Sequence, residues 1–180
     1  MIARYRVQDT GMIPRGGQVD LSNLTPQPFP VPVSAHFCPY EQCLDIVIGH
    51  LAAATETIWV QAYTFTQDHL ARALLQAHHR GVDVQVIACR SRRRDGFQRL
   101  PDLARAGIPC FWDGQHRIAH DKCCLIDHVW VLTGSINWSL SAQSSGETLL
   151  VLGPNKDLTA RFEQNWVRHL AHSDPWHLTV

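Results

Sequence analysis

The sequence predicts an α/β protein built on a mixed, partly parallel sheet. From residue 36 onward, strand-like and helix-like segments alternate with short joints. Residues 57–89 have the pattern strand, helix, strand, which is typical of a right-handed crossover between parallel strands. Residues 118–133 have the pattern of two strands joined by a tight turn, which predicts an antiparallel hairpin. Parallel and antiparallel pairs in one short chain therefore indicate a mixed sheet.

Hydrophobic spacing and turn residues place the individual elements. Leu44, Val47, Ile48 and Leu51 recur at helical spacing after Pro39, and Gly81 ends a second helical pattern. β-Branched and aromatic runs mark the strands. The expected order is a helix after Pro39, strand 57–63, helix 67–80, strand 82–89, helix 100–107, strand 108–113, strands 118–126 and 129–133, strand 147–152 and helix 155–169.

The first 35 residues differ in composition from the rest. Residues 1–35 carry five of the ten prolines and show neither strand nor helix periodicity, so they predict an extended, proline-rich N-terminal arm. Residues 36–180 predict a single domain, because a chain of 180 residues with 45% hydrophobic residues can bury one core.

Composition limits the protein's location and partners. Lys plus Arg and Asp plus Glu both total 16, so a nucleic-acid surface would need uneven placement of charge. No apolar stretch approaches the roughly 18 residues that span a bilayer. We expect a cytoplasmic protein without stable membrane association, or a periplasmic or secreted one if a signal peptide has been removed. All six cysteines are expected to be thiols, because a chain of this size does not need disulfides.

The residues that carry chemistry cluster around the predicted hairpin. In a strand from residue 118, His120 and Lys122 share a face and lie about 7 Å apart, whereas Asp121 points to the other face. The return strand ends at Gly134, which brings Ser135 and Asn137 beside that pair. An imidazole, an ammonium, a hydroxyl and an amide then face one small volume. This set offers a phosphodiester a nucleophile and donors for its oxygens.

The spacing of these residues resembles a known motif. The pattern His120-x-Lys122-x4-Asp127-x6-Gly134-Ser135-x-Asn137 resembles the HKD motif of the phospholipase D superfamily. The resemblance covers roughly residues 36–170 and is strongest to the small bacterial nuclease branch. It implies an α-β-α sandwich, with the mixed sheet flanked by helices, that carries one HKD half-site per chain.

The resemblance also implies a mechanism and a partner. In that family two HKD histidines meet across a pseudo-twofold axis: one forms a phosphohistidine, and the other protonates the leaving oxygen and later activates water. With one motif per chain, two chains must pair as a homodimer so that both copies of His120 share one active site. No cofactor is implied. One neutral and one protonated imidazole can coexist near pH 6 to 7, because the unperturbed imidazole pKa is about 6.5.

The other motif residues take roles by the same resemblance. Lys122 and Asn137 would bind the non-bridging oxygens, with Ser135 supporting them. Asp127 is expected to be structural, because it lies at the turn. Glu147 is the candidate for the family's acidic residue that orients the histidine, although Ser145 stands where the family often has Asn.

Two further groups are candidates for substrate contact. Arg90, Arg92, Arg93, Arg94 and Arg99 follow a strand, and they are either a solvated loop or a surface that holds phosphates. Trp138 follows Asn137 and either lines the cleft or packs in the core. Trp59, Trp112, Trp130 and Trp166 are expected in the core.

We expect no metal site. Two groupings contain suitable residue types, namely His36 with Cys38 and Cys43, and His116 with His120, Cys123 and Cys124. Neither has the paired C-x2-C or H-x3-H spacing of known zinc sites.

Three functions remain open. The first is a metal-independent phosphodiesterase that cleaves DNA or RNA as a homodimeric endonuclease. The second is a phospholipase D-type hydrolase of a lipid such as cardiolipin, although no amphipathic membrane helix is visible. The third is a non-catalytic nucleic-acid-binding module that uses the same pocket as a phosphate clamp.

Overall fold

An eight-stranded sheet organises residues 30–92 and 98–176, which this computed structural model describes. The strands are β1 (Val33–Cys38), β2 (Thr57–Ala62), β3 (Asp83–Cys89), β4 (Cys110–Asp113), β5 (Lys122–Ile126), β6 (Trp130–Gly134), β7 (Glu147–Leu152) and β8 (Ser173–Pro175). The helices are α1 (Cys43–Ala53), α2 (Asp68–His79), α3 (Leu100–Arg105) and α4 (Lys156–Ala171), with short 3-10 turns at Arg90–Arg92 and Leu140–Gln143.

The sheet is mixed, as predicted. Its strand order is β1-β7-β6-β5-β2-β3-β4-β8. β2, β3 and β4 run parallel, and the remaining neighbours are antiparallel. The strand, helix, strand unit of β2, α2 and β3 and the hairpin of β5 and β6 are therefore both confirmed.

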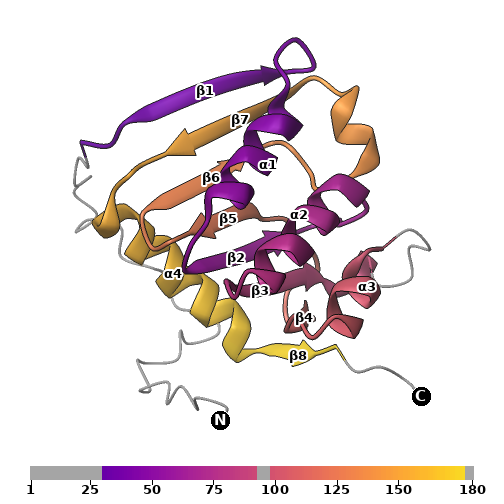
Figure 1. Cartoon of the computed structure of the whole chain (residues 1–180). Helices are drawn as coiled ribbons and strands as arrows, with labels where there is room; N and C mark the ends of the chain where they lie inside the picture. Colours follow the sequence, from indigo (N-terminus) through magenta and orange to yellow (C-terminus); the bar gives the residue numbers. More distant parts are fainter. Residues whose placement is uncertain (1–29, 93–97, 177–180) are drawn as a thin grey trace, which may run out of the picture. The chain divides into compact units, whose positions relative to one another are not determined.

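Helices cover both faces of the sheet (Figure 1). The apolar sides of α1, α2 and α3 pack on one face, where Leu51, Leu74 and Leu103 have no exposed surface. On the other face α4 buries Trp166, which stacks on Trp59 with ring centroids 4.8 Å apart. The predicted α-β-α sandwich is confirmed.

Two strands at the sheet edges were not predicted. β1 begins at Val33, inside the segment that the sequence assigned to the arm, and pairs along its length with β7. Flanking prolines hide its strand pattern. β8 has only three residues and ends in Pro175, which an edge strand tolerates. The predicted arm up to residue 29 lies outside the described residues.

The hairpin that carries the motif is shorter than predicted. β5 begins at Lys122 rather than at Ile118, so His120 lies just before the strand and not within it. The turn is the predicted two-residue connection, because Asp127 and His128 both have positive φ, at 52° and 58°. Positive φ at both central residues is the geometry of the turn that matches the twist of paired strands.

The expectation of six thiols is wrong for two cysteines. Cys38 and Cys43 form a disulfide, with Cα atoms 5.9 Å apart. Disulfides are typical of proteins in oxidising compartments. The four other cysteines are buried thiols, as expected: Cys89, Cys110, Cys123 and Cys124. Burial raises the pKa of Cys110 to about 12, so this thiol stays protonated.

Within the described residues, the longest apolar stretch of any helix falls short of what crossing a bilayer requires.

Candidate active site

His120 and Lys122 meet at the start of β5, on the face of the sheet that α1 and α2 cover. The Lys122 ammonium lies 3.2 Å from each of the two ring nitrogens of His120 and donates a 2.9 Å hydrogen bond to the His120 carbonyl. The imidazole is exposed, whereas Lys122 is only 9% exposed. The two heads therefore reach one site, as the sequence predicts, even though His120 precedes the strand.

The environment of Lys122 favours binding of an anion. Burial lowers the pKa of Lys122, while the negative charges of Asp121 and Glu147 act in the opposite direction. A poorly solvated ammonium gains more from an incoming phosphate than one in bulk water does, because the interaction is less screened.

Ser135 connects the end of β6 to the start of β7. Its hydroxyl donates a 2.5 Å hydrogen bond to the Glu147 carboxylate and accepts one of 2.9 Å from the backbone N–H of Thr148. Ser135 therefore fixes the position of Glu147, whose charge acts on Lys122. The structure thus joins three residues of the predicted site in one network.

Gly134 is required at its position by close backbone contact. Its φ is +143°, and a Cβ placed there would lie 2.1 Å from the Thr148 carbonyl oxygen. We expect Gly134→Ala to lower the free energy of unfolding by roughly 2–4 kcal/mol, because β6 would have to move away from β7. Urea unfolding measures this change. Gly146→Ala is the matched control, because no atom lies within 4 Å of its added methyl group. Equal stability of the two variants would contradict the prediction.

Asn137 contributes an amide whose oxygen has no hydrogen-bond partner among the described residues. Its Oδ1 is buried and accepts no hydrogen bond from the described residues. The side chain lines a cavity of about 230 Å³ together with Lys122, Thr133 and Trp138. Because buried amide oxygens are normally hydrogen-bonded, an unpaired one at a cavity wall is a candidate contact for a donor group of a ligand.

Trp138 combines the two alternatives that the sequence left open. It is 6% exposed and stacks on Phe65, with ring centroids 5.4 Å apart, so it belongs to the core. It also forms part of the cavity wall beside Asn137.

Asp127 lies at the opposite end of β5 from Lys122. Its carboxylate accepts hydrogen bonds of 2.8–3.2 Å from the backbone N–H groups of Thr55, Glu56 and Thr57 and from the Thr55 hydroxyl. It therefore ties the hairpin turn to the joint between α1 and β2. This geometry agrees with the structural role expected for it.

The arginine cluster is only partly available to a substrate. Arg90 forms an ion pair with Asp174, and Arg99 pairs with Asp68. Carboxylate partners compete with phosphate for these guanidinium groups. Arg92 lies over the Tyr63 ring, 4.8 Å from its centroid. The predicted contacts at Arg93 and Arg94 lie outside the described residues.

Tyr63 is a site residue that the sequence did not assign. Its ring centroid lies 4.6 Å from that of His120, and the Lys122 ammonium lies 5.4 Å from the same ring. The position follows from sheet register, because Ala62 at the end of β2 pairs with Lys122. In the sequence, Tyr63 stands at the end of a predicted strand. Its place beside His120 could be inferred only if that strand were known to pair with the strand that carries the motif.

Of the two groupings of possible metal ligands noted in the sequence, neither is assembled among the described residues. Cys38 and Cys43 are joined to each other. Among the described residues, one other set of possible ligands comes together: Asp113, His116, His169 and His172. In the sequence these residues form two short pairs, Asp113-x2-His116 and His169-x2-His172, which lie more than 50 residues apart.

Comparison with known proteins assigns the family. Residues 47–170, more than half of the chain, match the family model described as "Cardiolipin synthase, PLD-like domain". The chain belongs to the phospholipase D superfamily. Its membership confirms the resemblance seen in the motif, and this superfamily protein is a phosphodiesterase hydrolase.

Two curated relatives show how the superfamily member compares in sequence. It is 32% identical over 145 residues to a protein named phospholipase D from Rickettsia prowazekii, covering 81% of this chain and 71% of the relative. It is 26% identical over 148 residues to a mitochondrial cardiolipin hydrolase from Danio rerio, covering 79% of this chain and 65% of the relative.

Solved structures of the superfamily share the fold. The phospholipase D family member Nuc from Salmonella typhimurium superimposes with a TM-score of 0.76 at 27% identity, covering 82% of this chain and 99% of Nuc. NucT from Helicobacter pylori gives a TM-score of 0.73 at 23% identity, with 81% and 99% covered. Both match across nearly their whole length, which confirms the phospholipase D fold.

Proposed function

We propose that this phosphodiesterase is a metal-independent endonuclease that cleaves DNA or RNA through a phosphohistidine in a homodimeric active site. The observation that carries the proposal is the exposed His120 imidazole with the Lys122 ammonium 3.2 Å away, present once per chain. A two-step displacement needs a nucleophile and a separate acid. The single His120 of one chain can supply only one of these two groups, so the other must come from a second chain.

The chemistry follows from these positions. His120 attacks phosphorus, and the bond to the leaving oxygen breaks as His120 of the second chain protonates that oxygen. The second histidine then removes a proton from water, which attacks phosphorus and releases His120. Lys122 and the Asn137 amide donate to the non-bridging oxygens, whose charge increases in the transition state. Ser135 holds Glu147, whose charge acts against the lowering of the Lys122 pKa by burial.

The surroundings of His120 favour a nucleic-acid substrate. The site is open to solvent, and Tyr63 places an aromatic ring beside the imidazole. Aromatic rings stack on nucleobases of any sequence, and a nearby cation such as Arg92 attracts the backbone.

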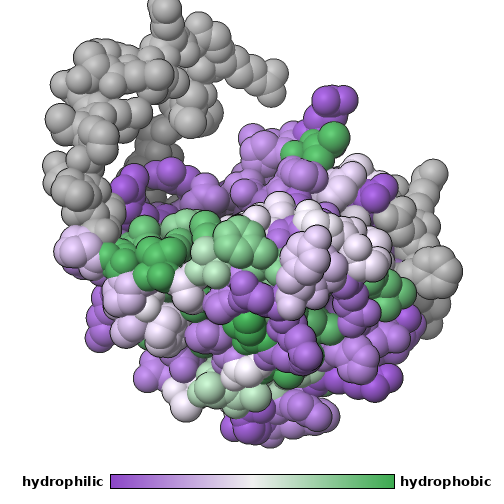
Figure 2. Space-filling model, turned by 90° about the horizontal axis from the view of Figure 1, so that it is seen from above, coloured by the Kyte–Doolittle hydropathy of each residue, from purple (hydrophilic) through white to green (hydrophobic). Residues whose placement is uncertain are grey.

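A lipid phosphodiester is the second candidate, and the cavity favours it. Its wall is largely apolar and adjoins Lys122 and Asn137. Tyr40, 93% exposed, and Leu140, 48% exposed, lie on segments that border it. An apolar cavity beside a phosphate site suits an acyl chain. However, on the face that Figure 2 shows, hydrophobic residues form separate patches among hydrophilic ones rather than one broad landing surface.

A substrate panel decides between these candidates. Protein in excess chelator is incubated with single- and double-stranded DNA, RNA, and vesicles containing cardiolipin. The proposal expects internal cleavage of at least one nucleic acid. Release of phosphatidic acid from vesicles, with all nucleic acids intact, would establish the lipid candidate in its place.

The homodimeric site makes a quantitative prediction for mixed chains. Wild-type and His120→Ala chains, separately tagged, are co-expressed in equal amounts. If each site needs both copies of His120, about one quarter of the dimers are active, and specific activity falls to about one quarter of wild type. Independent chains would retain about one half. His79→Ala, an exposed histidine on α2, is the matched control and should leave activity unchanged. A linear dependence on the wild-type fraction would exclude the shared site.

A further inference from the structure

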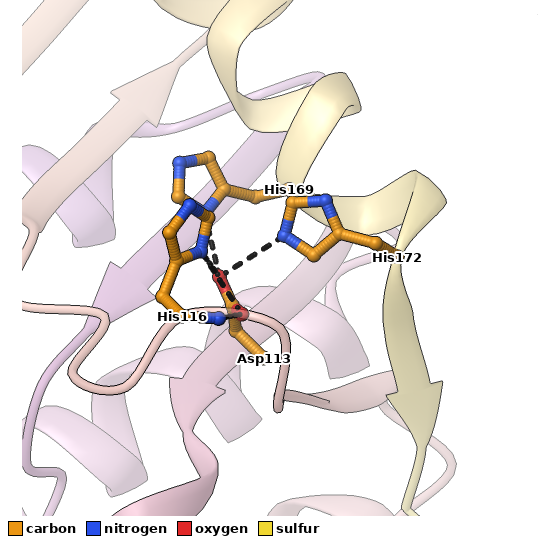
Figure 3. A group of neighbouring side chains, drawn as sticks. All are labelled: Asp113, His116, His169 and His172. Carbon is orange, nitrogen blue, oxygen red and sulfur yellow. Dashed lines mark hydrogen bonds and ion pairs between the residues drawn. The ribbon is translucent and has the colours of Figure 1, made fainter. Parts of the chain in front are cut away.

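A second cluster of ionisable side chains lies on the opposite face of the sheet, the face that α4 covers. Asp113 ends β4, and His116 follows in the next loop. His169 lies in the last turn of α4, and His172 caps that helix just before β8. Figure 3 shows the three imidazoles gathered around the Asp113 carboxylate.

The distances within this cluster are short. The Asp113 Oδ2 atom lies 2.7 Å from His169 Nδ1, 3.0 Å from His116 Nδ1 and 3.3 Å from His172 Nε2. One ligand atom from each of the four residues lies within 4.8 Å of the other three. The Asp113 side chain has no exposed surface, whereas the His116 side chain is 46% exposed. The inner end of the site is therefore buried, and its outer side is open, so that an ion can enter from solvent.

These separations fit a tetrahedral metal site. Zinc binds imidazole nitrogens at about 2.0–2.1 Å and carboxylate oxygens at about 2.0–2.2 Å, so ligand atoms around it lie about 3.3–3.5 Å apart. The observed carboxylate-to-imidazole distances require outward shifts of less than about 1 Å to reach that spacing, and the widest separation within the set, up to 4.8 Å, requires an inward shift of up to about 1.5 Å. Three imidazoles and one carboxylate complete four-coordination and leave no position for a substrate.

A further carboxylate stands behind one of the imidazoles. His169 directs Nδ1 at Asp113, and its other ring nitrogen, Nε2, lies 3.7 Å from the Asp121 carboxylate. Metal-bound histidines commonly direct their second nitrogen at a carboxylate, which orients the ring and strengthens it as a ligand. Asp121 adjoins His120 in the chain, so this contact connects the cluster to the segment that carries the proposed nucleophile.

We propose that Asp113, His116, His169 and His172 bind one structural zinc ion. The ion holds the C-terminal end of α4 and the edge strand β8 against β4. It also fixes the loop that begins at His116 and leads to His120. The histidine–carboxylate contacts already hold the four candidate ligands close to one another.

Metal content and spectroscopy test the proposal directly. Tag-free protein, purified without chelator, should contain one zinc per chain by elemental analysis. Replacing zinc with cobalt should produce the intense visible absorption of a four-coordinate site. With zinc at about 100 times its Kd, Tm should rise by about 5–10 °C relative to the chelated protein.

Variants of the two most exposed ligands test the proposal, because substitutions at exposed positions disturb folding least. His116→Ala and His172→Ala should each weaken zinc binding by about 100-fold or more and remove the cobalt spectrum. His79→Ala should bind zinc like wild type. The proposal would be overturned if the purified protein contained no zinc, showed no cobalt absorption, and changed in Tm on addition of zinc by the same amount in wild type and both variants. The four side chains would then form a proton-sharing network around Asp113. None of these measurements uses activity, so the outcome is independent of the proposed nuclease function.

Discussion

Replacing His120 with alanine is expected to reduce phosphodiester cleavage by about 10^4-fold or more, because the variant lacks both the nucleophile and its symmetry-related acid. Single-turnover cleavage of the preferred substrate in excess chelator measures the loss. Lys122→Ala should cost less, about 10²–10³-fold, because it removes a donor to the developing charge and leaves the bond-forming group in place. This order follows from the exposed ring of His120 and the buried ammonium beside it.

The covalent intermediate gives an independent measurement. Wild-type protein quenched in denaturant during turnover of a phosphorus-labelled substrate should carry label on the peptide that contains His120. The His120→Ala variant should carry none, and His79→Ala should behave as wild type. Tm measured on each variant controls for folding.

A non-catalytic binding module gives the opposite pattern. Wild-type protein would then bind nucleic acid with strong salt dependence, yield no cleavage product and no labelled peptide, and bind as well after His120→Ala. That combination would refute the catalytic proposal while leaving family membership intact.

The motif could be predicted from the sequence because its parts are local. His120 and Lys122 are two residues apart, and the turn at Asp127 fixes the register of β5 against β6. Hairpin register determines which side chains meet. The prediction that Lys122 and Asp121 face opposite sides of the sheet also holds: Lys122 lines the cavity near α1, and Asp121 approaches His169 of α4.

Contacts between distant segments could not be predicted in this way. Arg90 meets Asp174, and Asp113 meets His169, across separations that depend on how α4 returns along the sheet. The disulfide was missed for another reason. Chain length argues against a need for disulfides, but it does not prevent Cys38 and Cys43, five residues apart, from pairing.

Asp127 provides the second large effect, and it concerns stability rather than catalysis. We expect Asp127→Ala to lower the free energy of unfolding by about 2–4 kcal/mol. The change leaves the part-buried N–H group of Thr57 without its acceptor, at roughly 1–3 kcal/mol, whereas water can replace the acceptor at the exposed N–H groups of Thr55 and Glu56. It also places alanine at a φ of 52°, which adds about 1–2 kcal/mol.

Asp127→Asn separates the charge from the backbone conformation. Asparagine tolerates positive φ and keeps one acceptor oxygen, so the expected loss is smaller, about 1–2 kcal/mol. Urea unfolding at pH 7 measures both variants. Asp157→Asn, an exposed carboxylate in the first turn of α4, is the control and should change stability by less than about 1 kcal/mol.

The charge of Asp127 also predicts a pH dependence with a definite sign. Partial burial alone would raise the pKa of Asp127, but the hydrogen bonds from Glu56, Thr57 and Thr55 outweigh it and lower the pKa below its ordinary value. A carboxyl group whose pKa is lower in the folded state contributes stability above its unfolded pKa of about 3.9 and loses it as the pH falls through the folded value. The stability difference between wild type and Asp127→Asn should therefore be constant from pH 7 to about 5 and shrink below about pH 4. A difference that grows on acidification would mean that the protonated carboxyl, and not the carboxylate, holds the turn to the joint between α1 and β2.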